Sequence, residues 1–103
     1  MQCFAKSDRG AVRKENQDRA AGVRIRRKGC VVGVVCDGMG GAAGGKLASE
    51  LAASTFLAQF RREMMAGSAV EPAMRAACDA ANQAVYGRAC ADPELRGMGT
   101  TIV

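Results

Sequence analysis

Three side chains in the first 37 residues have the chemistry to hold a metal ion and a phosphate group. Asp37 follows an apolar, β-branched run over 31–36 that is typical of a buried strand, and Gly38 lets backbone carbonyls approach whatever the carboxylate holds. A charge in such a place is costly unless it is paired or bound to metal. Asp18 is a second oxygen ligand for a hard cation, and Arg13 offers a planar fork of donors for phosphate oxygens. Together they predict metal-assisted hydrolysis of a phosphate ester.

Two other interpretations of the glycine-rich segment stay open at this stage. Asp37-Gly38 is also ordinary turn chemistry, and would then only end a strand. A loop with Gly38, Gly40 and Gly44 between a strand and a helix also suggests a dinucleotide fold. Its spacing departs from the dinucleotide fingerprint, because Ala43 stands where the third glycine belongs. Asp37 would also place a negative charge beside the pyrophosphate.

Four motifs together resemble one known family. They are Arg13-x-x-Asn16-Gln17-Asp18, Asp37-Gly38-Met39-Gly40-Gly41, Ala48-Ser49 and Gly97-Met98-Gly99-Thr100-Thr101. In this order and at these spacings they resemble the metal-dependent protein phosphatases of the protein phosphatase 2C type, above all the bacterial serine/threonine phosphatases.

The resemblance implies a role for each candidate residue. In such enzymes the aspartate matching Asp37 bridges two Mn²⁺ or Mg²⁺ ions, and the carbonyl of the glycine matching Gly38 binds one of them. The aspartate matching Asp18 belongs to the same cluster, and the arginine matching Arg13 holds the substrate phosphate. The nucleophile is a metal-bridging water. The absence of histidine from the chain agrees with this, because it excludes histidine-based catalysis within these residues.

The chain departs from the family pattern at three points. Ala42 stands where many relatives carry histidine, and Lys46 where many carry an acidic residue. The family domain is also more than twice as long as these 103 residues, and its second half supplies further metal-binding aspartates. The resemblance therefore predicts that residues 1–103 are the N-terminal part of a single catalytic domain.

Composition narrows the class of protein. No apolar run approaches the length of a membrane span and no signal-peptide core begins the chain, so we expect a cytoplasmic protein. The five cysteines have no C-x-x-C pair and no histidine partner, which favours reduced and mostly packed thiols over zinc ligands.

The formal net charge is +5, and basic residues form a cluster at Arg24, Arg26, Arg27 and Lys28. We interpret this cluster as the solvated side of a hairpin. Since no aromatic residues are interleaved for base stacking, nucleic acid is not an expected partner. The basic side chains could instead attract phosphorylated or acidic segments of substrate proteins.

The elements that would position these residues are readable in outline. Strands are predicted at 2–7, 18–27, 30–36 and after Gly99, with an antiparallel turn at Lys28-Gly29. Helices are predicted at 44–65 and 70–90. Their predicted apolar stripes are Leu47, Leu51, Phe56, Leu57, Phe60 and Met64 in the first, and Met74, Cys78, Ala81 and Val85 in the second.

The predicted fold class is therefore α+β. The resemblance sharpens this to part of an αββα β-sandwich, with antiparallel strands and two long consecutive helices packed outside.

The predicted function is metal-dependent hydrolysis of phosphoserine and phosphothreonine in proteins, with two or more Mn²⁺ or Mg²⁺ ions. The expected partners are phosphorylated proteins, the targets of bacterial serine/threonine kinases. An isolated 103-residue chain is expected to be inactive and poorly stable. The alternatives are a non-catalytic phosphoprotein-binding or regulatory remnant that keeps Arg13, and a nucleotide-binding module.

Overall fold

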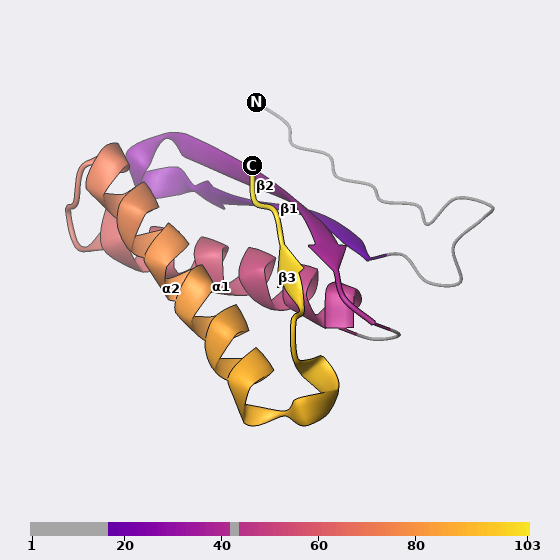
Figure 1. Cartoon of the computed structure of the whole chain (residues 1–103). Coiled ribbons are helices and arrows are strands. Elements are labelled where there is room, and N and C mark those ends of the chain that lie inside the picture. Colours follow the sequence, from indigo (N-terminus) through magenta and orange to yellow (C-terminus); the bar gives the residue numbers. More distant parts are fainter. Residues whose placement is uncertain (1–16, 42–43) are drawn as a thin grey trace.

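The computed structural model describes residues 17–41 and 44–103, which form a three-stranded antiparallel sheet and two long helices (Figure 1). The strands are β1 (Asp18–Ile25), β2 (Cys30–Met39) and β3 (Gly99–Thr100), in the sheet order β1-β2-β3. The long helices are α1 (Gly44–Met65) and α2 (Val70–Ala91), and the short 3₁₀ helices are η1 (Arg26–Lys28) and η2 (Pro93–Leu95). The predicted α+β class is confirmed. The strand predicted at 2–7 lies outside the described residues.

The β1–β2 hairpin closes close to the predicted turn. Gly29 adopts the left-handed conformation at φ 59°, and its N–H donates to the carbonyl of Arg26 at 3.1 Å. Since 26–28 form η1, β1 ends two residues earlier than predicted. β2 in contrast runs three residues beyond its predicted end, to Met39. The interpretation of Asp37-Gly38 as a turn is therefore wrong: both residues lie within a paired strand.

One face of the sheet is covered by α1. Helix α1 contacts all three strands and α2, whereas α2 packs mainly on α1 and η2 (Figure 1). Alternation along β2 points Val34 and Cys36 into this layer, where both are buried. On the helix side the rings of Phe56 and Phe60 stack with centroids 6.2 Å apart. The opposite face of the sheet leaves Val35 and Met39 exposed.

The predicted apolar stripe of α2 is partly wrong. The buried residues of this helix are Ala73, Ala77, Ala81 and Val85, whereas Met74 and Cys78 are exposed. The true stripe lies one residue earlier in its first half, because α2 packs closely on α1 and small alanine side chains permit that approach. In α1 the predicted Phe56, Phe60 and Met64 are buried, and Leu47, Leu51 and Leu57 are partly buried against the same core.

The cysteines also differ from the prediction of mostly packed thiols. Cys36 is buried and Cys30 is intermediate, but Cys78 and Cys90 are exposed. All four are free, and burial raises the pKa of the Cys36 thiol. Cys3 lies outside the described residues.

Within the described part of the chain, neither long helix is apolar enough to cross a bilayer.

Candidate metal centre

Asp18 and Asp37 face each other across the hairpin. They are register partners on β1 and β2, and both are exposed. The N–H of Gly38 donates to the carbonyl of Gln17 at 3.0 Å, so this hydrogen-bonded rung lies beside the aspartate pair. The aspartates therefore form a non-hydrogen-bonded pair, in which Cα atoms approach to about 4.5 Å and side chains share one face. Two like charges placed so repel each other, and Asp18 has a further interaction partner as well. A cation between the two carboxylates would remove their mutual repulsion.

The backbone of Gly38 is enclosed on the side of α1. A Cβ atom at this position would lie 1.9 Å from the carbonyl oxygen of Gly45 and 2.6 Å from that of Gln17. Only glycine fits. In an antiparallel ladder a residue points its N–H and C=O to the same side, so the carbonyl of Gly38 is directed toward the start of β1, where Asp18 follows. Gly38, the predicted third ligand, thus adjoins the Asp18–Asp37 pair along the ladder.

Gln17 joins the start of β1 to the glycine-rich segment. Its side-chain Nε2 donates to the carbonyl of Gly40 at 3.3 Å, and a Cβ on Gly45 would lie 2.6 Å from its amide carbon. The residue that precedes Asp18 is therefore fixed against the segment that follows Asp37. Gln17 belongs to the motif that ends at Asp18, but no role was predicted for it; its position next to a candidate ligand was the available signal.

Thr101 holds the backbone of Asp37 from the other side. The N–H of Asp37 donates to the hydroxyl Oγ1 of Thr101 at 3.0 Å, and the N–H of Thr101 donates to the carbonyl of Asp37 at 2.9 Å. This positioning role was also missed. A hydroxyl residue directly after a short strand is too common a pattern to predict it.

The described residues hold only part of the predicted site. Asp18, Asp37 and Gly38 are brought together, whereas Arg13 and Ala42 lie outside the described residues, so the phosphate-binding prediction for Arg13 stays a prediction. Lys46 is exposed near the start of α1. No group of three or more acidic, cysteine or histidine side chains suited to a metal ion occurs within 17–41 and 44–103.

This donor set fits a hard divalent cation. Two neighbouring carboxylates and one carbonyl are all oxygen donors, and Mg²⁺ is commonly held by one or two carboxylates with water completing the shell. The chain contains no histidine, and the neighbouring thiol of Cys36 is buried on the α1 side of the sheet, so the usual ligands of softer metals do not join the two carboxylates. The residues present therefore fit Mg²⁺ or Mn²⁺.

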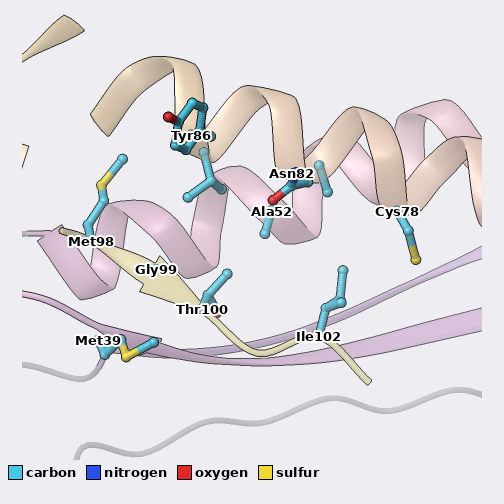
Figure 2. A pocket seen from close by; sticks show the side chains of 11 residues that line it. Met39, Ala52, Cys78, Asn82, Tyr86, Met98, Gly99, Thr100 and Ile102 are labelled. Atoms are coloured by element: carbon cyan, nitrogen blue, oxygen red, sulfur yellow. The ribbon is translucent and has the colours of Figure 1, made fainter. Parts of the chain in front are cut away.

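A separate hollow lies between α2 and the C-terminal strand. It has a volume of about 260 Å³, and Figure 2 shows Thr100 and Ile102 projecting from the strand side toward Tyr86 and Asn82 of α2. Asp18 and Asp37 do not line it. Met39, two residues after Asp37, is the one residue of β2 that lines this hollow, so the hollow and the candidate metal centre are neighbouring but distinct features.

Comparison with known proteins agrees with the motifs. The family model described as protein phosphatase 2C matches residues 9–103. The chain belongs to the protein phosphatase 2C family. Serine/threonine protein phosphatase PstP of Mycobacterium tuberculosis is 37% identical over 99 residues, which are 95% of this chain and 18% of that protein.

One further relative and a solved structure of PstP are also longer than this chain. Serine/threonine phosphatase stp of Listeria monocytogenes is 30% identical over 105 residues, covering 100% of this chain and 41% of its own length. The crystal structure of the M. tuberculosis phosphatase PstP/Ppp superimposes with a TM-score of 0.74 at 34% identity, covering 94% of this chain and 38% of that one. The chain thus spans less than half the length of each of these relatives.

The strand pairing tests the dinucleotide-fold interpretation of the glycine-rich segment. The three strands pair antiparallel, so the described residues contain no parallel β-α-β unit of the kind that binds dinucleotides. The nucleotide-binding alternative is therefore not supported.

Proposed function

We propose that this chain is the N-terminal part of the catalytic domain of a metal-dependent phosphatase that acts on phosphoserine and phosphothreonine in proteins. The relatives it matches are named as serine/threonine phosphatases, which supports this enzyme class. The observation that carries the proposal is the pairing of Asp18 with Asp37 beside the enclosed backbone of Gly38. The cytoplasmic location expected from the sequence stays a prediction.

The proposed domain is completed by residues that this chain does not contain. The open face of the sheet carries exposed apolar side chains, Val35 and Met39, beside the two carboxylates. A second sheet packed on this face would bury those side chains and bring further ligands to the carboxylates. This is the basis for proposing a sandwich and for expecting no turnover by the 103-residue chain alone.

Each proposed role follows from the chemistry of the side chain. Asp18, Asp37 and the carbonyl of Gly38 would hold Mn²⁺ or Mg²⁺, and Arg13 would bind and orient the substrate phosphate. A bound divalent ion supplies Lewis-acid stabilisation of the phosphoryl oxygens and lowers the pKa of coordinated water toward neutrality. Gln17 and Thr101 keep the two aspartates in register by fixing the backbone on either side.

Metal binding by the chain itself is the first test. We expect Mn²⁺ to raise the melting temperature of the chain, because the ion binds the folded state and offsets repulsion between the two carboxylates. Asp37→Asn should remove the Mn²⁺ effect and, without metal, stabilise the chain by about 0.2–1 kcal/mol. Asp79→Asn, an exposed position on α2, is the control with the same loss of charge and should keep the effect.

An Mn²⁺ effect that persists unchanged in Asp37→Asn would overturn the metal assignment. Differential scanning fluorimetry across a series of Mn²⁺ concentrations, with Ca²⁺ and buffer alone as references, measures both quantities.

Turnover is tested on the longer protein, if the reading frame continues beyond residue 103. We expect Mn²⁺-dependent release of phosphate from a phosphothreonine peptide. Asp37→Asn should lower kcat by more than about 100-fold, and Arg13→Ala should mainly raise KM. Phosphate-dependent binding without any turnover would instead support the regulatory remnant.

A further inference from the structure

A cavity with basic walls lies at the end of the hairpin opposite the candidate metal centre. It has a volume of about 300 Å³ and is formed by the last residues of β1, by η1 and by the C-terminal part of α1. Its lining residues are Arg24, Ile25, Arg26, Arg27, Arg61 and Met65. Four of these six side chains are guanidinium groups, and Lys28 follows directly on η1.

Most arginine side chains of this basic cavity have no partner among the described residues that would neutralise their charge. Arg24 has an interaction partner. Arg26, Arg27 and Arg61 are exposed, and through their side chains they make no ion pair or hydrogen bond with the described residues. The nearby Arg62 donates to Gln59 instead. Guanidinium groups gathered at one concave site repel one another, and an anionic ligand relieves that repulsion.

We propose that the basic cavity is a docking site for an acidic segment of the phosphoprotein substrate. The proposal rests on the proposed function for the identity of the partner as a substrate, but the carboxylate-binding surface itself does not depend on catalysis. Arginine forks pair with the carboxylates of Asp and Glu in a bidentate manner, which gives the site geometric selectivity as well as attraction.

The position of the cavity defines where the acidic segment must lie in the substrate. Asp18 and Ile25 are the two ends of β1, seven residues apart, which corresponds to about 23 Å of strand. A fully extended peptide covers about 3.3–3.6 Å per residue. An acidic segment that reaches the basic cavity while its phosphoresidue is at the metal centre must therefore be separated from that residue by about seven positions or more.

A protein partner fits this surface better than a nucleic acid does. No aromatic side chain lines the cavity, and the aromatic residues of the described chain lie elsewhere: Phe56 and Phe60 are buried and Tyr86 is on α2. Single-stranded nucleic acids are held by bases stacked on aromatic rings in addition to charge. Ile25 and Met65 give the cavity an apolar side that suits the side chains of a peptide.

The test is the affinity of the 103-residue chain for a fluorescein-labelled oligoglutamate peptide, measured by fluorescence anisotropy at low salt. The peptide carries no phosphate, so the result is independent of metal binding and turnover. The variant Arg26→Glu/Arg61→Glu reverses two charges of the basic cavity. Arg88→Glu/Arg96→Glu reverses two exposed charges on and after α2, outside that cavity, and is the matched control.

We expect the cavity variant to bind about tenfold more weakly than the wild type and the control within about twofold of it. Binding should weaken as NaCl is raised. Equal losses in both variants would overturn the proposal, since the effect would then be net charge alone. No saturable binding of the peptide would also overturn it, as would tighter binding of an oligodeoxynucleotide through the same arginines. Circular dichroism of both variants verifies that they fold.

Discussion

The two ends of the β1–β2 hairpin are built on opposite principles. At the end with Asp18 and Asp37 the backbone is enclosed, because a Cβ on Gly38 would collide with the carbonyl of Gly45. At the other end Gly29 has no atom within 4 Å of its ideal Cβ position, and the surrounding side chains are exposed arginines. Both ends contain a glycine, but one is required by packing and the other by backbone conformation.

This difference corresponds to two kinds of recognition. Metal coordination, the proposed role of the enclosed end, needs oxygen ligands held at fixed separations, and backbone contacts on both sides of Asp37 would hold them there. Attraction of an acidic peptide needs charge rather than fixed geometry, and long arginine side chains on an open turn supply it. Strand β1 thus connects the proposed metal centre, with its enclosed backbone, to the proposed docking cavity, with its exposed side chains.

The largest effect is expected at the enclosed end. Gly38→Ala should lower the free energy of unfolding by about 3 kcal/mol or more, because the new methyl group meets backbone atoms that cannot move aside. Gly33→Ala is the matched control on the same strand, where the nearest atom to an added Cβ is the carbonyl oxygen of Ala21 at 3.7 Å. Urea denaturation followed by circular dichroism measures both. Similar losses in the two variants would show that the enclosed end is no tighter than the strand centre.

A smaller effect is expected from the positioning hydroxyl. Thr101→Val removes the acceptor of the Asp37 N–H and should cost about 0.5–1.5 kcal/mol. Thr101→Ser keeps the hydroxyl and should restore most of that loss. Hydrogen exchange at the Asp37 amide is the direct readout: its protection should fall in Thr101→Val and recover in Thr101→Ser. Unchanged protection in the valine variant would contradict the positioning role.

An effect of similar size is expected at the basic end. Gly29→Ala places a Cβ in the left-handed region at φ 59° without meeting any atom, so it should cost only about 1 kcal/mol. Gly29→Asn should cost less, because asparagine tolerates this conformation. Thermal denaturation compares the two. A loss as large as that of Gly38→Ala would mean that the comparison between the two ends is wrong.

Local signals made most of the elements predictable. Three signals lie close to observed element ends: the glycines before α1, Gly67-Ser68 between the two helices and Asp92-Pro93 after α2. Each changes the backbone conformation only locally, so its effect could be predicted from the sequence. The stripe of α2 was misplaced since methionine and cysteine look more apolar than alanine in sequence. A position on α2 is buried where it makes close contact with α1, and that contact is visible only in the packed structure.

The candidate site was less accessible to sequence reasoning. The carboxylates could be named as ligands, but their pairing depends on the register of the hairpin, which the η1 turn sets. The contacts of Gln17 and Thr101 depend on segments far apart in sequence. Asp18 and Asp37 were predicted as ligands from their residue type and context, whereas the carbonyl of Gly38 as a ligand came from the family resemblance. The structure adds that Asp18 and Asp37 are register partners and that Gly38 follows on the same strand.

The connection between Thr101 and Asp37 spans 64 positions, whereas the hairpin and the α1–α2 pair each form between neighbours in sequence. Contacts between distant positions require closure of a longer loop and are the slow part of folding. We therefore expect the C-terminal strand to dock after the hairpin and the helices. During synthesis the ligand pair at Asp37 would then reach its final geometry only once residues near 101 have left the ribosome. The order of synthesis would thus delay completion of the proposed metal centre until the last described strand has docked.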